Sequence, residues 1–279
     1  MNLRRTVWLA VAAVASASAG SSSAIAGSLT IKGSDTMVVL GQRWAEEYMK
    51  KVAGTTLQVT GGGSGTGISA LINGTTDVCQ ASRAMSAAEK EKLRDRYATT
   101  GTETTVARDG LSIYVNASNP LTEITMDQLK EIFTGKVTSW KDLGGADSKI
   151  IVYSRENSSG TYVFFKEHVL KNADYTARAQ TMPGTAAVVN AVAKEKFGIG
   201  YGGAAYAKGI KILKVKKDAA TPGVAPELAN VKDGSYPLSR PLFFYTRNKP
   251  SGDIKGFVDW VLSAEGQDIV TKVGYFPVK

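Results

Sequence analysis

Short apolar segments and helical runs alternate along this 279-residue chain, and clusters of Gly, Ser and Thr stand at their junctions. Three such clusters lie at 33–36, 61–67 and 155–161, each after an apolar segment and before a run with helical spacing. A succession of strand, loop and helix is typical of an α/β fold with a mixed, mostly parallel sheet. Because parallel strands end at one edge of a sheet, the clusters are expected to meet there.

The spacing of apolar residues predicts the individual elements. Strands are expected around Val78 and at 28–31, 57–59, 112–115, 150–153, 198–201 and 242–246. Helices are expected at 37–52, 66–73, 124–133, 161–170, 185–194 and 254–262, the last being the final helix. Thr125 is the expected cap of the helix at 124–133. Segment 218–237, rich in Pro and Gly, is expected to be a long loop.

The unit of strand, cluster and helix recurs in the second half of the chain, which predicts two similar lobes. The chain is expected to cross between them near 106–112 and again near 236–241. The expected division places residues 27–108 and 240–279 in lobe I and residues 109–239 in lobe II. Two crossing strands would form a hinge and leave a cleft between the lobes.

Residues 1–26 have the pattern of a secretory signal peptide. Arg4 and Arg5 precede an apolar stretch at 7–17, and Ala24-Ile25-Ala26 is a small-x-small cleavage site. Cleavage after Ala26 is expected, although an uncleaved anchor is the alternative. Because no cysteine lies near this site, a lipid-anchored form is not expected.

The single cysteine and single histidine restrict the chemistry. Cys79 has no partner for an internal disulfide, and its apolar neighbours indicate a buried strand residue. His168 lies in a helical run, where a surface position is expected. The net charge of +9 comes from scattered Lys and Arg residues, without the aromatic and basic pattern of a nucleic-acid site. Attraction of small anions is the simpler use of this charge.

The clusters have the chemistry of an oxyanion site. The first N–H groups of a helix lack partners and carry partial positive charge, while Ser and Thr add hydroxyl donors. Arg155 adds a planar fork that can bind two oxygen atoms. For each cluster, a flexible loop, a helix cap or a surface ion pair is the alternative. The candidate anion-binding residues are Thr36, Met37, Ser64, Gly65, Thr66, Arg155, Ser159, Gly160 and Thr161.

Enzyme motifs with similar composition do not match. The run 61–67 lacks the Gly-Lys-Ser/Thr of a phosphate-binding loop, and Thr66 replaces the second glycine of a nucleophile elbow. A Ser-His-Asp triad would need His168, the single histidine, which lies in a helical run, and the sequence shows no cluster of metal ligands. No catalytic residue, metal or cofactor is therefore expected.

The clusters resemble those of the PstS-type periplasmic phosphate-binding proteins, the solute receptors of ABC importers. The resemblance covers nearly the whole chain after residue 26 and is most specific at Arg155-x-x-x-Ser159-Gly160-Thr161. It also includes Lys32–Thr36, Gly63–Gly67, Ala81–Arg83, Gly198–Tyr201 and Tyr236–Leu242. It implies a two-lobed, type II-like clamshell with phosphate between the lobes. Its implied phosphate contacts are Thr36, Met37, Ser64, Arg155, Ser159, Gly160 and Thr161.

The chain departs from this family at Arg83. Many family members carry an aspartate after Ala-Ser, where it accepts the phosphate proton and helps to reject sulfate. Arg83 is expected to add a donor and a positive charge to the site instead; the alternative is a side chain that points to solvent.

The expected function is therefore an extracytoplasmic receptor that binds inorganic phosphate and delivers it to an ABC importer. The resemblance implies inner-membrane permease subunits as partners and a periplasmic location, and a monomer that binds no nucleic acid is expected. One alternative is a receptor for sulfate, molybdate or a phosphonate. Less favoured alternatives are a secreted phosphatase and a surface adhesin or scavenger.

Overall fold

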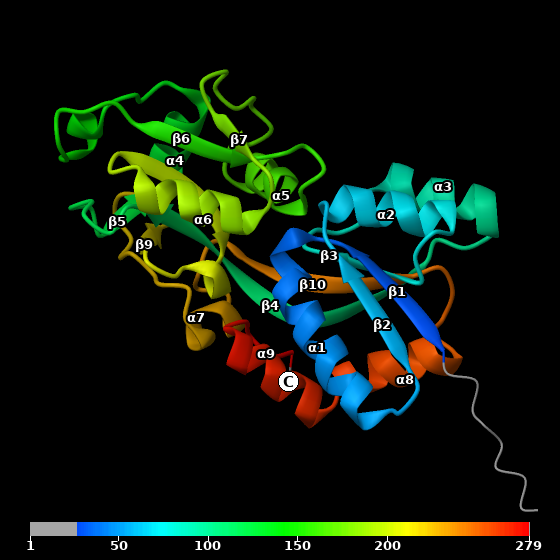
Figure 1. The fold of residues 1–279 in the computed structure, drawn as a ribbon. Helices are drawn as coiled ribbons and strands as arrows, with labels where there is room; N and C mark the ends of the chain where they lie inside the picture. The colour runs from blue at the N-terminus through cyan, green and yellow to red at the C-terminus, as the bar shows by residue number, and fades with distance from the viewer. Residues whose placement is uncertain (1–26, 279) are drawn as a thin grey trace, which may run out of the picture.

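The structure is a computed structural model that describes residues 27–278 (Figure 1). The expected signal peptide, residues 1–26, lies outside the described residues. Within residues 27–278, no helix has the length and apolar character needed to cross a membrane.

Strands and helices alternate as expected for an α/β fold. The strands are β1 (Ser28–Gly33), β2 (Thr56–Thr60), β3 (Val78–Ala81), β4 (Thr102–Val115), β5 (Glu123–Thr125), β6 (Ile151–Arg155), β7 (Gln180–Met182), β8 (Gly198–Gly203), β9 (Lys211–Lys216) and β10 (Ser239–Thr246). The α-helices are α1 (Val38–Lys51), α2 (Ser64–Asn73), α3 (Ala87–Tyr97), α4 (Met126–Thr134), α5 (Gly160–His168), α6 (Thr185–Lys194), α7 (Leu228–Lys232), α8 (Gly252–Val261) and α9 (Ala264–Val273). The short 3₁₀ helices are η1 (Asp35–Met37), η2 (Trp140–Leu143) and η3 (Ala204–Tyr206).

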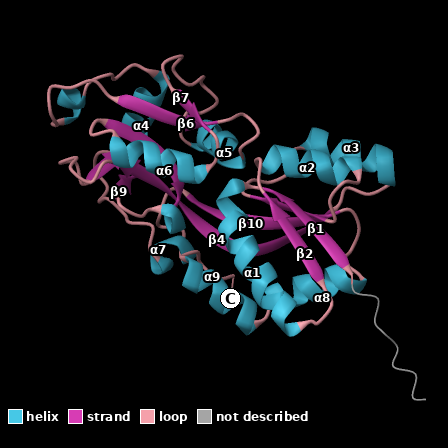
Figure 2. Cartoon of the chain, viewed as in Figure 1, coloured by secondary structure: helices cyan, strands magenta, loops and turns pink. Residues whose placement is uncertain are grey.

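The sheet has two parallel ends joined by an antiparallel centre. Its strand order is β2-β1-β3-β10-β4-β8-β6-β7, and β9 and β5 extend it from β4. β1 pairs in parallel with β2 and β3 at one end, as β6 does with β7 and β8 at the other. The predicted mixed α/β fold with helices flanking the sheet is thus confirmed (Figure 2).

The two largest hydrophobic cores of the described residues lie along this sheet, beside two smaller clusters. The first core includes Trp44 and Phe257, and the second includes Phe133 and Phe165. β4 belongs to both cores, because Val106 and Ala107 lie in the first while Leu111 and Ile113 lie in the second. The elements that pack on the first core are called the first half of the molecule, and those that pack on the second core are called the second half.

The chain returns from the second core to the first along β10, which lies beside β4. Leu238, just before β10, packs in the second core, whereas Leu242 and Phe244 pack in the first. β4 and β10 pair antiparallel and run from one group of elements to the other (Figure 2).

Local sequence signals explain several element boundaries. Thr125 caps α4 as predicted, since its hydroxyl accepts the Gln128 N–H while the Gln128 side chain accepts the Thr125 N–H. α4 ends at Gly135, whose positive φ of 81° suits a residue without a side chain. The predicted helix 185–194 coincides with α6.

Three expectations about elements were wrong. The helix at 254–262 is not the final one, because α9 follows with Ile269 and Val270 buried on the first core. The expected loop at 218–237 contains α7, which buries Val231 on the second core. The expected strand at 112–115 is only the end of β4, which begins at Thr102.

Candidate functional site

Helix starts from both halves converge on one buried site. η1 follows β1, α2 follows β2, and α5 follows β6, so each of the three sequence clusters stands at a strand end (Figure 1). The halves touch through the backbone here, because the Gly65 N–H donates to the Ser158 carbonyl at 2.9 Å. A side chain on Gly160 would place its Cβ 2.3 Å from the Ser64 hydroxyl, so the two helix starts are in close contact.

Five hydroxyl groups form the centre of the site, and we call them the hydroxyl cluster. Its members are Ser34, Thr36, Ser64, Ser82 and Thr161, which are all at most 2% exposed. The Oγ1 atoms of Thr36 and Thr161 lie 2.9 Å apart, and the Ser34 hydroxyl donates to that of Ser82 at 2.9 Å. The Ser64 hydroxyl accepts the Ser82 N–H at 3.0 Å. Buried hydroxyls can donate to an anion that has lost its water shell.

Arg155 lies beside this cluster and joins the halves through an ion pair. Its side chain is 1% exposed and donates to Asp35 Oδ2 at 2.8 Å, to Glu156 Oε2 at 3.0 Å and to Thr185 Oγ1 at 3.0 Å. Burial raises the pKa of Glu156, but the hydrogen bond and charge of Arg155, together with backbone hydrogen bonds, hold it below the ordinary value. The two carboxylates therefore hold the guanidinium in a fixed plane.

Asp35 connects the first two clusters. Its Oδ1 accepts the Gly62 N–H at 2.8 Å, and its backbone carbonyl accepts the hydroxyl of Tyr206 at 2.7 Å. Burial raises the pKa of Tyr206 to about 12, so this hydroxyl stays protonated and remains a donor at neutral pH. The loop after β1 is thus held by side chains and backbone from both halves.

Several predicted donors already have partners within their own loops. The Met37 N–H donates to Ser34 O at 3.0 Å, and the Thr66 hydroxyl donates to Gly62 O at 2.6 Å. The Ser159 hydroxyl caps α5 by accepting the Tyr162 N–H at 3.3 Å. Among the predicted residues, the structure brings Thr36 against Thr161 and Ser64 against Gly160.

Arg83 lies at the edge of the site, in an ion pair with Glu89. Its Nη1 and Nη2 atoms donate to the two Glu89 oxygens at 2.8 Å and 2.7 Å. Burial lowers the pKa of Arg83, but the hydrogen bonds to Glu89 and the charge of that carboxylate, with smaller effects from other groups, leave it above the ordinary value. Glu89 also closes a capping box with Ser86 at the start of α3. The guanidinium is therefore directed to α3, although a Cβ on Gly65 would lie only 3.7 Å from Arg83 Nη2.

Sequence reasoning did not assign a role to Thr185 or Arg240. Thr185 repeats the position of Ser64, because both residues begin a helix directly after a glycine of positive φ, 94° at Gly63 and 85° at Gly184. The repeated Gly-Ser and Gly-Thr starts were a readable signal. Arg240 donates to Thr161 Oγ1 at 3.0 Å and to Ser82 O at 3.1 Å, so it contacts two residues of the hydroxyl cluster.

Two cavities lie near this region. One of about 470 Å³ is lined by Ser82, Arg83, Phe164, His168 and Arg240 among others, so it reaches the hydroxyl cluster. His168 is exposed, as expected, at the end of α5 and stacks on Phe164 with ring centroids 4.0 Å apart. This cavity adjoins the predicted anion site.

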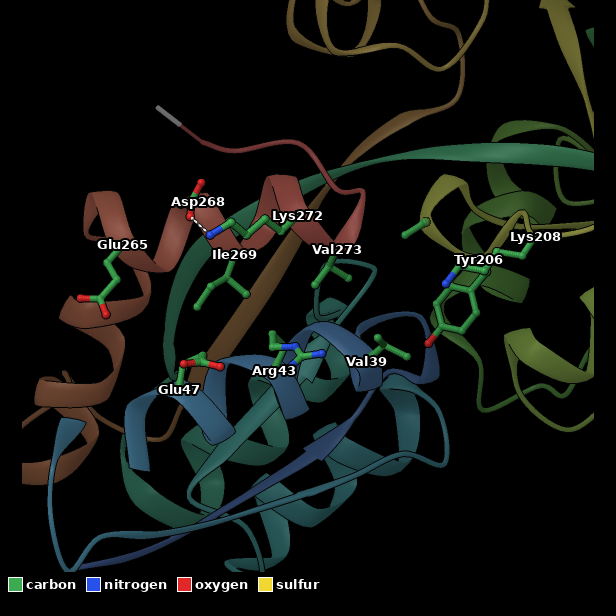
Figure 3. A pocket seen from close by; sticks show the side chains of 11 residues that line it. Val39, Arg43, Glu47, Tyr206, Lys208, Glu265, Asp268, Ile269, Lys272 and Val273 are labelled. Carbon is green, nitrogen blue, oxygen red and sulfur yellow. Dashed lines mark ion pairs between the residues drawn. The ribbon is translucent and has the colours of Figure 1, made fainter. Parts of the chain in front are cut away.

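The other cavity, of about 660 Å³, lies between α1 and α9 and is closed at one end by Tyr206 and Lys208 (Figure 3). Charged side chains of both signs line it, and Lys272 pairs with Asp268 at its rim. It shares no lining residue with the hydroxyl cluster. The hydroxyl cluster, where buried donors converge, is therefore a better candidate for an anion site than this larger space.

The described residues offer little for covalent chemistry. No grouping of three or more His, Cys, Asp or Glu side chains within residues 27–278 has a geometry that suits a metal ion. Cys79 is fully buried, as expected, and burial raises the pKa of its thiol far above the ordinary value. The arrangement is suited to holding an anion with hydrogen bonds.

Known proteins are similar to this chain in sequence and in fold. The family model of the PBP superfamily domain matches residues 18–265, which defines the class of the protein as a binding protein of that superfamily. The Phosphate-binding protein PstS of Pseudomonas aeruginosa PAO1 is 34% identical over 273 residues, covering 92% of this chain and 84% of that protein. The Bacillus subtilis protein of the same name is 36% identical over 253 residues, covering 90% and 81%.

Solved structures agree with these relatives. A phosphate ABC transporter substrate-binding protein of Clostridium perfringens, solved with bound phosphate, matches with a TM-score of 0.82 and 32% identity, covering 91% of this chain and 100% of that one. An ABC-type phosphate transport receptor from Vibrio cholerae matches with a TM-score of 0.72 and 29% identity, covering 89% and 99%. The chain belongs to the family of PstS phosphate-binding proteins. Membership of this family makes it a receptor and not an enzyme.

Proposed function

We propose that this protein binds inorganic phosphate between its two halves and delivers it to an ABC importer. One observation carries the proposal: the hydroxyls of Thr36 and Thr161, each at a helix start in a different half, meet at 2.9 Å in a buried site. A dehydrated anion placed there would receive donors from both halves, so its binding would stabilise the closed arrangement.

The chemistry of the donors supports phosphate as the ligand. Charge-assisted hydrogen bonds contribute roughly 1.5–3 kcal/mol each, so several can hold a dehydrated phosphate. We propose contacts from Thr36, Ser64, Gly160 and Thr161, with Arg155 and Ser159 beside them. Met37, Gly65, Thr66 and Arg83 remain predictions from the sequence. The named function of the Pseudomonas relative and the phosphate bound to the Clostridium protein support the same ligand.

We propose that the halves move about β4 and β10. The proposed lobes are residues 27–108 with 240–279, and residues 109–239. The change of core between Ala107 and Leu111 in one strand and between Leu238 and Leu242 in the other supports this division. Such paired crossings are suited to hinge closure around a ligand.

A receptor for another oxyanion is the second candidate, and Arg83 favours it. The aspartate that accepts a phosphate proton in many relatives is replaced by Arg83, whose guanidinium binds Glu89. A site that lacks this acceptor would discriminate less between phosphate and sulfate, which carries no proton at neutral pH.

The proposed setting is the periplasm, with residues 1–26 removed as a signal peptide. The proposed partners are the permease subunits of an ABC importer, which would recognise the closed form. We propose a monomer that has no affinity for nucleic acid. Secretion of a tagged full-length protein, followed by determination of the mature N-terminus, tests the cleavage after Ala26.

Titration calorimetry tests the ligand. Protein 27–279, refolded from denaturant to remove bound anions, should bind one phosphate per chain, and native mass spectrometry of undialysed protein should find the same anion. For the first candidate, a receptor specific for phosphate, a hundredfold excess of sulfate should leave phosphate binding unchanged. Equal binding of sulfate would support the general oxyanion receptor, and no binding of either anion would contradict both candidates.

A further inference from the structure

Arg240 and Asp109 form a buried ion pair on the two strands that join the cores. They lie directly opposite each other in the antiparallel ladder of β10 and β4. Arg240 is 2% exposed and Asp109 is 0% exposed. Arg240 donates to Asp109 Oδ2 from Nη2 at 2.8 Å and from Nε at 3.1 Å. The carboxylate fixes the direction in which the guanidinium extends.

The remaining donors of Arg240 reach both halves of the molecule. Nη2 donates to Thr161 Oγ1 at the start of α5, at 3.0 Å. Nη1 donates to the Ser82 carbonyl after β3, at 3.1 Å. The guanidinium carbon lies 5.2 Å from the centre of the Phe164 ring, which covers one face of the group. Arg240, on a strand that joins the two halves, therefore contacts one member of the hydroxyl cluster in each half: Ser82 in the first and Thr161 in the second.

The contact with Thr161 determines what that hydroxyl can do. A hydroxyl has one proton to donate, and its lone pairs accept. Because Thr161 Oγ1 accepts an N–H from a cation, one of its lone pairs faces Arg240 and its proton is directed elsewhere. Thr36 Oγ1 lies 2.9 Å from Thr161 Oγ1, so the Thr161 proton is free to point to Thr36 or to an anion bound between the two hydroxyls.

We propose that Arg240 is a positioning residue of the anion site, which orients Thr161 as a donor to phosphate and links the anion to closure of the two halves. This inference rests on the proposed phosphate-binding function. Asp109 keeps Arg240 in place when the halves separate, because both residues lie on the connecting strands. The bonds to Thr161 and Ser82 form together only when the halves meet.

Lysine cannot replace Arg240 in this role. A lysine ammonium is a single point of charge, whereas the guanidinium holds Asp109, Thr161 and Ser82 from one rigid plane. Asp109 Oδ1 has no hydrogen-bond partner among the described residues, so removal of Arg240 leaves the whole carboxylate unpaired. Arg240→Lys retains a cation opposite Asp109 and serves as the second variant if Arg240→Gln does not fold.

Phosphate titration of a double-mutant cycle tests the inference. We expect Arg240→Gln to weaken phosphate binding roughly 10- to 100-fold in the wild-type background. In a Thr161→Val background the same change should alter the affinity about twofold or less, because Arg240 acts through the missing hydroxyl. Arg247→Gln is the matched control, since Arg247 follows β10 and donates to Thr76 O, remote from the hydroxyl cluster. It should bind phosphate like the wild type.

Each result has one interpretation. Failure of the wild-type protein to bind phosphate would contradict the proposed function and not this role of Arg240. A wild type that binds phosphate, together with an Arg240→Gln or Arg240→Lys variant of equal affinity, would overturn the inference. An equal loss in the wild-type and Thr161→Val backgrounds would also overturn it, because that is the result of a purely structural role.

Discussion

The side-chain oxygens of Thr36 and Thr161 lie 2.9 Å apart, although 125 positions separate the two residues. Each residue stands at the start of a helix after a strand, one in each half of the molecule. If those helix starts move apart, the two hydroxyls part with them. Binding of an anion between them and movement of the halves therefore depend on the same few atoms.

Gly160→Ala should prevent this approach. The added Cβ would lie 2.3 Å from Ser64 Oγ and 2.8 Å from Ser82 Oγ, which is shorter than van der Waals contact permits. We expect phosphate affinity to fall roughly a hundredfold or more, because the closed form becomes poorly accessible. Small-angle scattering should show that phosphate makes the wild type more compact but not the variant. An unchanged affinity would show that these helix starts do not meet in the bound form.

Ser64→Ala should remove one donor while leaving the fold in place. Ser64 is fully buried, and its hydroxyl accepts the Ser82 N–H, so about 1 kcal/mol of stability is expected to be lost as well. Phosphate affinity measured by calorimetry should fall roughly 10- to 100-fold. Ser69→Ala, at an exposed position of the same helix, is the control and should match the wild type in both measurements.

Arg155→Ala should affect both binding and stability. The change leaves Asp35 and Glu156 without their shared cation, at side chains that are 18% and 29% exposed. We expect loss of detectable phosphate binding and a decrease in unfolding free energy of roughly 2 kcal/mol, since part of the repulsion is relieved by solvent. Urea unfolding followed by circular dichroism measures the second effect. Stability equal to that of the wild type would show that the ion pairs contribute nothing net.

Glu89→Gln should alter the pH dependence of stability. Burial raises the pKa of Glu89, but hydrogen bonds from Arg83 and Ser86 outweigh burial and lower it from 4.5. A lowered pKa stabilises the folded state fully above about pH 4.5, and this stabilisation is lost as the pH falls through the folded-state pKa. At pH 7 the variant should be about 1 kcal/mol less stable than the wild type, and the difference should shrink as the pH falls below about 4.5.

Glu91→Gln provides the comparison for that measurement. Glu91 lies on the same helix and pairs with Arg94, but both side chains are more than half exposed. Its stability should differ from the wild type by less than about 0.5 kcal/mol at either pH. A constant difference between wild type and Glu89→Gln from pH 3 to pH 7 would contradict the assignment to the Glu89 carboxylate.

Elements with strong local signals could be predicted from the sequence. α4 begins with a capping box and ends at a glycine, both visible in the residues themselves. α6 has Val188, Val189 and Val192 on its buried side, a spacing typical of a helix against a core. The positions of Thr36, Ser64 and Thr161 at helix starts after strands were predictable for a similar reason, because clusters of small polar residues follow apolar strand segments.

Contacts made across the fold were beyond such local patterns. Arg240 meets Asp109 only because β10 pairs with β4, and 131 positions separate the two residues. The antiparallel register that places them opposite each other has no marker in either segment. The partner of Arg83 lies closer in sequence. Ser86 and Glu89 have the spacing of a capping box, but that spacing does not show that Glu89 also binds Arg83.

The pairing of β4 with β10, the two strands that join the halves, affects how much free energy is needed to separate the halves. Neighbouring strands of one ladder form a ribbon that can twist while its amide-to-carbonyl links persist. If the halves swing about this ribbon, opening breaks contacts between side chains and loops but requires no local unfolding. Amides of the ribbon should therefore exchange with deuterium equally slowly with and without phosphate, while those of the loops that meet across the cleft become protected only in its presence.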